Sequence, residues 1–450
     1  MPSDETVKFP TEYEEKRERM LELLRKGDPQ EAYSILLSVL DYPMEITNEL
    51  VFKDALKIFE KIAIKISGKE LGDLVRKVID DVDDIQALFD LSYELYEESQ
   101  HGLAATLLSR ANKIEPQDAH IIPELVSNLE ELMLNDEARR VLLEAEDLLD
   151  ESELCRYLLA YNTLMTGDME EPTEILKTLK HVEDEDLNSI VQSFEGMLNR
   201  ARYLKKARSL DNKDLRGWHA VLNGTLLLHY SPYGDDSMNG RYAYMADSYT
   251  LCSEGIERVR GVIKEAGINI PCVYSLHDRS SKILALAASE ILGIPLKQWN
   301  GDSEPGLIVV YDMEEIDSED TLIQISDHRP EQVLWAHASC WTYPFPISPD
   351  ITTFLYQMKT SPWDGGMIYD RESEDVRRAD PDESPLEVIA NNIKNAVKDD
   401  EYLDDFDDVI SILKELKDIK DEHSRLGIFK SHGRRIRQRI GSPVPSNRFL

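Results

Sequence analysis

Residues 85–118, IQALFDLSYELYEESQHGLAATLLSRANKIEPQD, are followed by residues 119–152, AHIIPELVSNLEELMLNDEARRVLLEAEDLLDES, and the second stretch repeats the pattern of the first. Apolar or small residues recur at an offset of 34 positions. The matched pairs are Leu88 and Ile122, Leu91 and Leu125, Ser92 and Val126, Leu95 and Leu129, Ala104 and Ala138, Leu108 and Leu142, and Ala111 and Ala145. Each stretch has the spacing of two short amphipathic helices joined by a polar turn. Because one such unit cannot bury its apolar face alone, the pattern predicts a stack of helix pairs.

The two stretches resemble repeats of the tetratricopeptide repeat family. The family has a small residue at place 8, alanines at places 20 and 27, and proline at place 32. These places are filled here by Ser92, Ala104, Ala111 and Pro116, although the family's tryptophan at place 4 and tyrosine at place 11 are missing. Three further segments of similar length are candidate repeats, at residues 13–46, 47–82 and 153–186. The segment 47–82 matches the family poorly. A bundle of helices without repeats is the alternative.

The resemblance implies a solenoid of paired helices over residues 1–210, whose groove binds a protein or a peptide. Composition fits such a protein, since 450 residues carry 87 acidic and 51 basic side chains, a formal net charge of −36. That charge opposes binding to nucleic acid and to anionic membranes. No apolar run is long enough to insert into a membrane, and residues 1–10 lack the pattern of a secretory leader. We therefore expect a cytoplasmic interaction protein, with self-association left open.

The four cysteines lie far apart in the chain, at Cys155, Cys252, Cys272 and Cys340. Without paired spacing they predict neither a disulfide framework nor a zinc ribbon.

The pattern changes after the helical region. The stretch YSPYGDDSMNGRYAYM (230–245) is rich in glycine and aromatic residues and is expected to be a loop. Helices and strands then alternate, with expected helices at 247–267, 281–293 and 321–328 and expected strands at 268–276, 306–312 and 332–341. This alternation predicts a mostly parallel sheet with helices over residues 211–370. Two further helices are expected within 385–423, at 385–398 and 403–422. The predicted fold class is therefore α + α/β.

Part of this second region resembles the core of type I phosphoribosyltransferases. LALAASEILGIP (284–295) resembles that family's first core helix, and residues 307–339 follow the family in length and order. In the family, two acidic residues at a strand end bind the ribose hydroxyls, and a loop rich in threonine and glycine holds the phosphate. Here Asp312 is followed by Met313, and the loop EEIDSED (314–320) contains no glycine. The resemblance thus implies a phosphoribosyltransferase-like domain that has lost catalysis.

Ligands of α/β sheets bind beyond the carboxyl ends of the strands. The candidate ligand-binding residues at these ends are His277, Arg279, Ser280, Asp312 and Glu315. The acidic residues of the 314–320 loop fit a solvated helix N-terminus better than a divalent cation, so no metal, cofactor or catalytic residue is predicted. The alternative is an enzyme for a nucleotide-like or sugar-phosphate substrate, with Asp312 and Arg279 in its site.

The tail, residues 424–450, carries seven Arg or Lys side chains and no acid. Because it has too little apolar surface for a core, it is expected to be mobile in the free protein unless docked, and to bind a partner. The residues expected to make this contact are Arg434, Arg435, Arg437, Arg439, Phe449 and Leu450. One alternative is that the tail docks on the acidic stretch 399–408 of the same chain. Another is that it binds nucleic acid, which we expect no other part of the chain to do.

Overall fold

The computed structural model of the protein describes residues 10–43, 48–232, 238–301, 304–342, 346–369, 376–378, 380–397, 405–417, 419 and 433–435. The chain divides into two compact units, which we call the helical unit (Met1–Val182) and the sheet unit (Glu183–Leu450). The boundary expected at residue 210 lies inside the sheet unit, because helix α12 (Glu185–Leu204) packs on helices α13 (Leu215–Asn223) and α18 (Phe406–Leu416).

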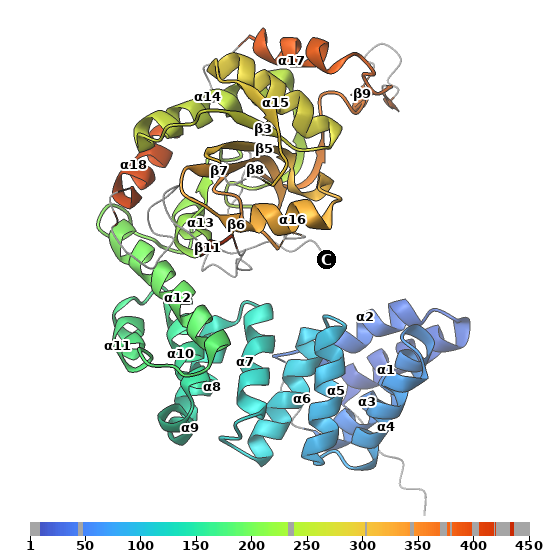
Figure 1. Ribbon diagram of the computed structural model, residues 1–450. Coiled ribbons are helices and arrows are strands. Elements are labelled where there is room, and N and C mark those ends of the chain that lie inside the picture. The colour runs from blue at the N-terminus through green and yellow to red at the C-terminus, as the bar shows by residue number, and fades with distance from the viewer. Residues whose placement is uncertain are drawn as a thin grey trace, which may run out of the picture. The chain divides into compact units, whose positions relative to one another are not determined.

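Successive helices of the helical unit pack against one another in pairs (Figure 1). The pairs are α1 (Thr11–Lys26) with α2 (Pro29–Leu40), α3 (Glu49–Ile66) with α4 (Lys69–Asp80), α5 (Ile85–Glu97) with α6 (His101–Ile114), α7 (Ile121–Glu131) with α8 (Asn135–Glu144), and α10 (Glu153–Met165) with α11 (Glu170–Thr178). The short helix α9 (Glu146–Glu151) precedes α10. Asp84 begins α5 by accepting a hydrogen bond from the Ala87 amide at 3.1 Å, as a helix N-cap residue does.

The matched positions of the sequence repeat form the buried seam of these pairs. Every residue of the seven pairs named above has a relative exposure between 0% and 2%. Ala104 and Ala138, where a larger side chain would separate neighbouring helices, are completely buried. The predicted register of the repeat is therefore confirmed.

The sheet unit begins with α12 and α13 and then alternates between strands and helices. Its other helices are α14 (Tyr249–Ala266), α15 (Arg279–Leu292), α16 (Glu319–Ser326) and α17 (Leu386–Lys394), with a 3-10 turn η1 (Met313–Glu315). Its strands are β1 (Leu226–Leu227), β2 (Tyr242–Ala246), β3 (Val273–Ser275), β4 (Leu296–Gln298), β5 (Gly306–Asp312), β6 (Asp327–His328), β7 (Gln332–Cys340), β8 (Ile351–Thr360), β9 (Met367–Tyr369), β10 (Val376–Arg378) and β11 (Gly433–Arg434).

The main sheet has the order β1-β8-β7-β5-β3-β4, and β2 pairs with the later half of β8. All of these pairings are parallel. The prediction that 306–312 is a central strand with parallel neighbours at 270–276 and 332–338 is confirmed by β3, β5 and β7. Residues 230–245 are only partly a loop, because β2 begins at Tyr242 and pairs with β8, a strand distant in sequence.

The chain leaves β3 through α15 towards β4, and it leaves β5 through α16 towards β7 on the other side. The direction of winding therefore reverses between the adjacent strands β3 and β5, which defines a topological switch point. Helices α14 and α15 lie on one side of the strands, with α17 packed on both, while α16 lies on the other side (Figure 1).

Part of the basic tail belongs to this fold. β11 pairs antiparallel with β6, and the buried Arg435 guanidinium contacts both carboxylate oxygens of Asp350, with a shortest distance of 2.9 Å. The same guanidinium donates hydrogen bonds to the carbonyls of Ile325, Asp327 and Gln332. Residues 433–435 are thus docked on the sheet unit, where Asp350 supplies a buried acceptor that composition does not reveal. Arg437, Arg439, Phe449 and Leu450 lie outside the described residues.

Among the helices described, none combines the length and the apolar character that crossing a bilayer requires.

Candidate functional site

The switch point between β3 and β5 collects several of the predicted ligand-binding residues. Ser280 lies in the first turn of α15 after β3, while Asp312 and Glu315 follow at the end of β5. The Ser280 hydroxyl accepts a hydrogen bond from the Trp363 indole at 3.1 Å and is hydrogen-bonded to Glu315. The structure thus brings Ser280, Asp312 and Glu315 together at the carboxyl edge of the sheet.

The cation of this edge is Lys359, which lies near the end of β8. Its ammonium group is 3.0 Å from Asp312 Oδ2 and 3.0 Å from Glu315 Oε1. The Tyr356 hydroxyl also donates a hydrogen bond to Asp312 Oδ2, at 2.6 Å. Two carboxylates therefore already neutralise the amine, which leaves little attraction for a phosphate dianion.

The electrostatics of this trio follow from burial and charge. Burial acts to lower the pKa of Lys359, but the carboxylates of Asp312 and Glu315 outweigh it, so the pKa lies above its usual value. Burial raises the pKa of Glu315, against the opposing effect of the lysine.

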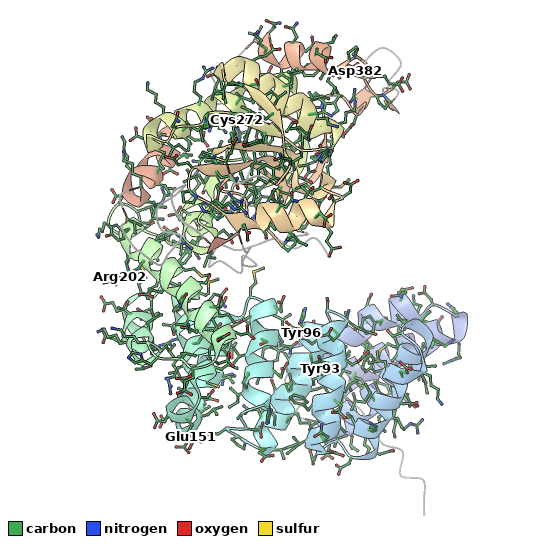
Figure 2. All side chains as sticks on the ribbon, in the orientation of Figure 1. Tyr93, Tyr96, Glu151, Arg202, Cys272 and Asp382 are labelled. Atoms are coloured by element: carbon green, nitrogen blue, oxygen red, sulfur yellow. The ribbon has the colours of Figure 1, made fainter. Side chains whose placement is uncertain are left out.

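The other two predicted residues lie at the rim. The His277 side chain is exposed. Arg279 is exposed as well, and its Nη2 donates hydrogen bonds to the carbonyls of Asp382 at 2.6 Å and Ser384 at 3.4 Å. Asp382 is labelled in Figure 2. Arg279 thus holds the segment that leads into α17.

A second polar cluster lies beneath this edge and was not predicted. It consists of Asp247, which follows β2, Cys252 on α14, Tyr311 on β5 and His337 on β7. We call these four residues the buried cluster. The side chains of Asp247 and His337 have no exposed surface, and Cys252 is equally buried. Close approach of α14 depends on Gly255, since a Cβ atom there would lie 3.0 Å from His337 Nδ1.

One carboxylate oxygen, Asp247 Oδ2, is the centre of the buried cluster. It lies 2.7 Å from the Tyr311 hydroxyl, 3.1 Å from His337 Nε2 and 3.4 Å from Cys252 Sγ. Cys252 Sγ is also 3.8 Å from His337 Nε2. Asp247, Cys252 and His337 each offer one ligand atom, and these atoms all lie within 4.8 Å of one another, a grouping that could hold a metal ion.

Protonation of Cys252 disfavours nucleophilic chemistry in the buried cluster. Burial, and then the neighbouring carboxylate of Asp247, raise the pKa of the Cys252 thiol well above its usual value. Burial acts to raise the pKa of Asp247 too, but the His337 ring and the hydrogen bonds to the carboxylate outweigh it and hold the pKa low. A protonated thiol is a poor nucleophile.

Sequence reasoning missed Lys359 and the whole buried cluster. Asp247 and His337 are 90 positions apart, and Lys359 lies 44 positions after Glu315. No short motif can contain such pairs. The available signal was the strand 351–360, because a parallel strand beside β7 would have placed Lys359 at the carboxyl edge.

Comparison with known proteins gives no family. No protein-family model matches the chain, and no curated protein matches it. A solved structure of MamA AMB-1 is 18% identical, with 39% of this chain and 96% of that chain covered and a TM-score of 0.24. A structure of MamA MSR-1 is 20% identical, with 37% and 94% covered and a TM-score of 0.23. Likeness at these scores carries no argument about function, and the resemblance to phosphoribosyltransferases stays a hypothesis.

Proposed function

We propose that the helical unit is a protein-interaction module that binds a protein or peptide partner. The observation that carries this proposal is a row of aromatic side chains on α5, Phe89, Tyr93 and Tyr96. Spacings of four and three positions place all three on one side of that helix. Tyr93 is 53% exposed, and Figure 2 labels it together with Tyr96.

An exposed tyrosine on a rigid helix suits binding, because a large ring can enter a partner's pocket with little loss of conformational entropy. Polar groups flank the row. The Tyr96 ring meets the His101 ring edge to face with centroids 5.1 Å apart, and His101 Nδ1 lies 3.4 Å from Asn128 Oδ1. With a chain charge of −36, a partner of net positive charge is favoured.

The test compares two exposed apolar residues of the helical unit. Tyr93→Ser removes the most exposed ring of the row, whereas Ile114→Ser alters a side chain that is 41% exposed at the end of α6. The wild type and each variant are expressed as tagged full-length proteins and used to recover partners from the native cell. We expect Tyr93→Ser to lower the affinity for the main partner by about 30-fold, which is the effect of losing a hot spot of about 2 kcal/mol. Ile114→Ser should leave this affinity unchanged. Equal recovery with both variants would refute this surface.

For the sheet unit we propose a phosphoribosyltransferase-like domain without catalysis. The arrangement that supports this is Lys359 held between Asp312 and Glu315, beside a loop that has no glycine to approach a phosphate. The competing proposal, an enzyme for a nucleotide-like or sugar-phosphate substrate, would use Asp312 and Arg279. Turnover of phosphoribosyl pyrophosphate that is lost in Asp312→Asn would establish the enzyme. We expect no turnover and no rise in melting temperature with this compound or with nucleotides.

A further inference from the structure

The buried cluster contains a carboxylate without a permanent cation. Asp247 Oδ2 is contacted by a tyrosine hydroxyl, a cysteine thiol and an imidazole. Within the described residues, no lysine or arginine forms an ion pair with Asp247. Asp350, by contrast, is buried against Arg435. A buried charge is costly unless it is paired. The Asp247 carboxylate would therefore be stabilised by a bound cation, which no lysine or arginine among the described residues supplies.

The three candidate ligand atoms are spaced as the corners of a metal coordination shell. Bonds to zinc of about 2.3 Å from sulfur, 2.0–2.1 Å from nitrogen and 2.0–2.2 Å from oxygen place tetrahedral ligands about 3.3–3.6 Å apart. The observed separations are 3.1 Å for oxygen to nitrogen, 3.4 Å for oxygen to sulfur and 3.8 Å for sulfur to nitrogen. Shifts of a few tenths of an ångström would complete the shell.

The same geometry argues against a nucleophilic cysteine. In a cysteine–histidine–carboxylate relay the two partners occupy opposite ring nitrogens, so that one nitrogen takes the thiol proton while the other is oriented by the acid. Here Cys252 and Asp247 both approach His337 Nε2. Among the described residues, the buried His337 Nδ1 has no hydrogen-bond partner. Convergence of two side chains on one ring nitrogen is the arrangement of ligands around a common ion.

We propose that Asp247, Cys252 and His337 bind a zinc ion, with Asp247 Oδ2, Cys252 Sγ and His337 Nε2 as ligands. Thiolate, imidazole and carboxylate together suit zinc. Binding releases the thiol proton of Cys252 to solvent, and the neutral ring carries its proton on Nδ1. Within the part of the chain that the structure describes, this Nδ1 has no partner in the metal-free protein either, so zinc adds no new unsatisfied group.

The site is of the structural kind. All three ligands are buried, whereas a catalytic zinc keeps a position open to substrate. The Tyr311 hydroxyl, 2.7 Å from Asp247 Oδ2, is placed to hold the liganding carboxylate in orientation. The ion would join the β2–α14 connection and α14 to β7, whose ligand lies 85 to 90 positions later in sequence.

The test begins with the wild-type full-length protein, stripped with a chelator and loaded with zinc or with cobalt(II). We expect one zinc per chain by elemental analysis. The cobalt form should show the absorption of thiolate-to-metal charge transfer together with the intense visible bands of a tetrahedral ion. Absence of bound zinc, or a cobalt spectrum without the thiolate band, would overturn the proposal without any variant.

Variants then assign the ligands. Cys252→Ala should lower zinc affinity by more than about 100-fold, since even changes outside the ligand set cost about 10–100-fold. Cys272→Ala is the matched control, because Cys272 is also buried in the sheet unit but contacts the Pro305 carbonyl, at 3.6 Å. Asp247→Asn keeps the shape of the site, and circular dichroism checks that each variant is folded. Zinc binding that survives both Cys252→Ala and Asp247→Asn would refute these ligands.

The structural role has its own readout. At zinc concentrations about 100 times the dissociation constant, loading should raise the melting temperature of the sheet unit by about 5–10 °C. The increase should vanish in Asp247→Asn and persist in Cys272→Ala. Zinc bound at the predicted ligands with no change in melting temperature would overturn the structural role.

Discussion

The two units of this chain bury different kinds of side chain. In the described part of the helical unit the most deeply buried polar residues are uncharged, namely Ser92, Asn128, Asn135, Asn162 and Thr163. The sheet unit buries many ionisable ones, among them Arg216, Arg258, Asp312, Asp350 and Arg435. The helical unit therefore depends on apolar packing at a repeated spacing. The sheet unit depends in addition on ion pairs between distant segments, which are strongly destabilising when one partner is removed.

The sharpest way to break this contrast is Arg435→Ala. The change leaves the Asp350 carboxylate buried with His328, 3.1 Å away, as its remaining ion-pair partner. We expect the sheet unit to lose about 3–5 kcal/mol in its free energy of unfolding, measured by denaturant titration. The matched control is Lys394→Ala, which breaks an ion pair with Glu290 that is exposed and should cost under about 1 kcal/mol. Equal effects of the two variants would mean that the buried pair is not special.

Overpacking tests the helical unit. Ala104→Leu and Ala138→Leu force extra methyl groups into fully buried contacts between helices and should each cost about 1–3 kcal/mol. The exposed Ala119→Leu serves as the control and should change stability by less than about 0.5 kcal/mol. The measurement is the stability of the helical unit, monitored by hydrogen exchange of peptides from that unit as the temperature is raised. Tolerance of leucine at both seam positions would show that the helices are free to shift.

A smaller effect concerns pH and runs in opposite directions in the two units. Burial raises the pKa of Glu130 on α7 to about 7, with a hydrogen bond from Asn162 opposing the shift. A carboxyl with a raised folded-state pKa contributes stability that is complete below its unfolded value, about 4.3, and is lost as the pH rises through about 7. The helical unit should therefore be about 1–2 kcal/mol more stable at pH 5 than at pH 8, and Glu130→Gln should remove this difference.

Asp350 shows the opposite sign. Its pKa is lowered because the charges of Arg435 and His328 and their hydrogen bonds outweigh burial. Its contribution is therefore present above the unfolded value of about 3.9 and is lost as the pH falls below it. Hydrogen exchange resolved by peptide reports each unit separately. A common pH dependence of both units would contradict the assignment of these two carboxyls.

The features that could be predicted from the sequence are those with a local or a periodic cause. The seam residues recur at a fixed offset, and β5 and β7 are continuous apolar runs, so both were predicted together with their parallel pairing. Strand β8 was not predicted, although ITTFLYQMKT (351–360) is rich in the β-branched and aromatic residues that favour strands and lies between β7 and β1. Lys359 and the buried cluster depend on that strand order. They could not be inferred until the sheet was known.

The ion pair between Asp350 and Arg435 also affects how the chain folds during its synthesis. The ribosome adds about 5–20 residues per second, so the 85 positions between these residues take about 4–17 s. During that interval the helical unit, whose seam joins segments near in sequence, is free to fold. Until Arg435 is added, the Asp350 carboxylate between β7 and β8 lacks its arginine partner. A chaperone that recognises nascent chains would therefore find its longest-lived opportunity on the sheet unit.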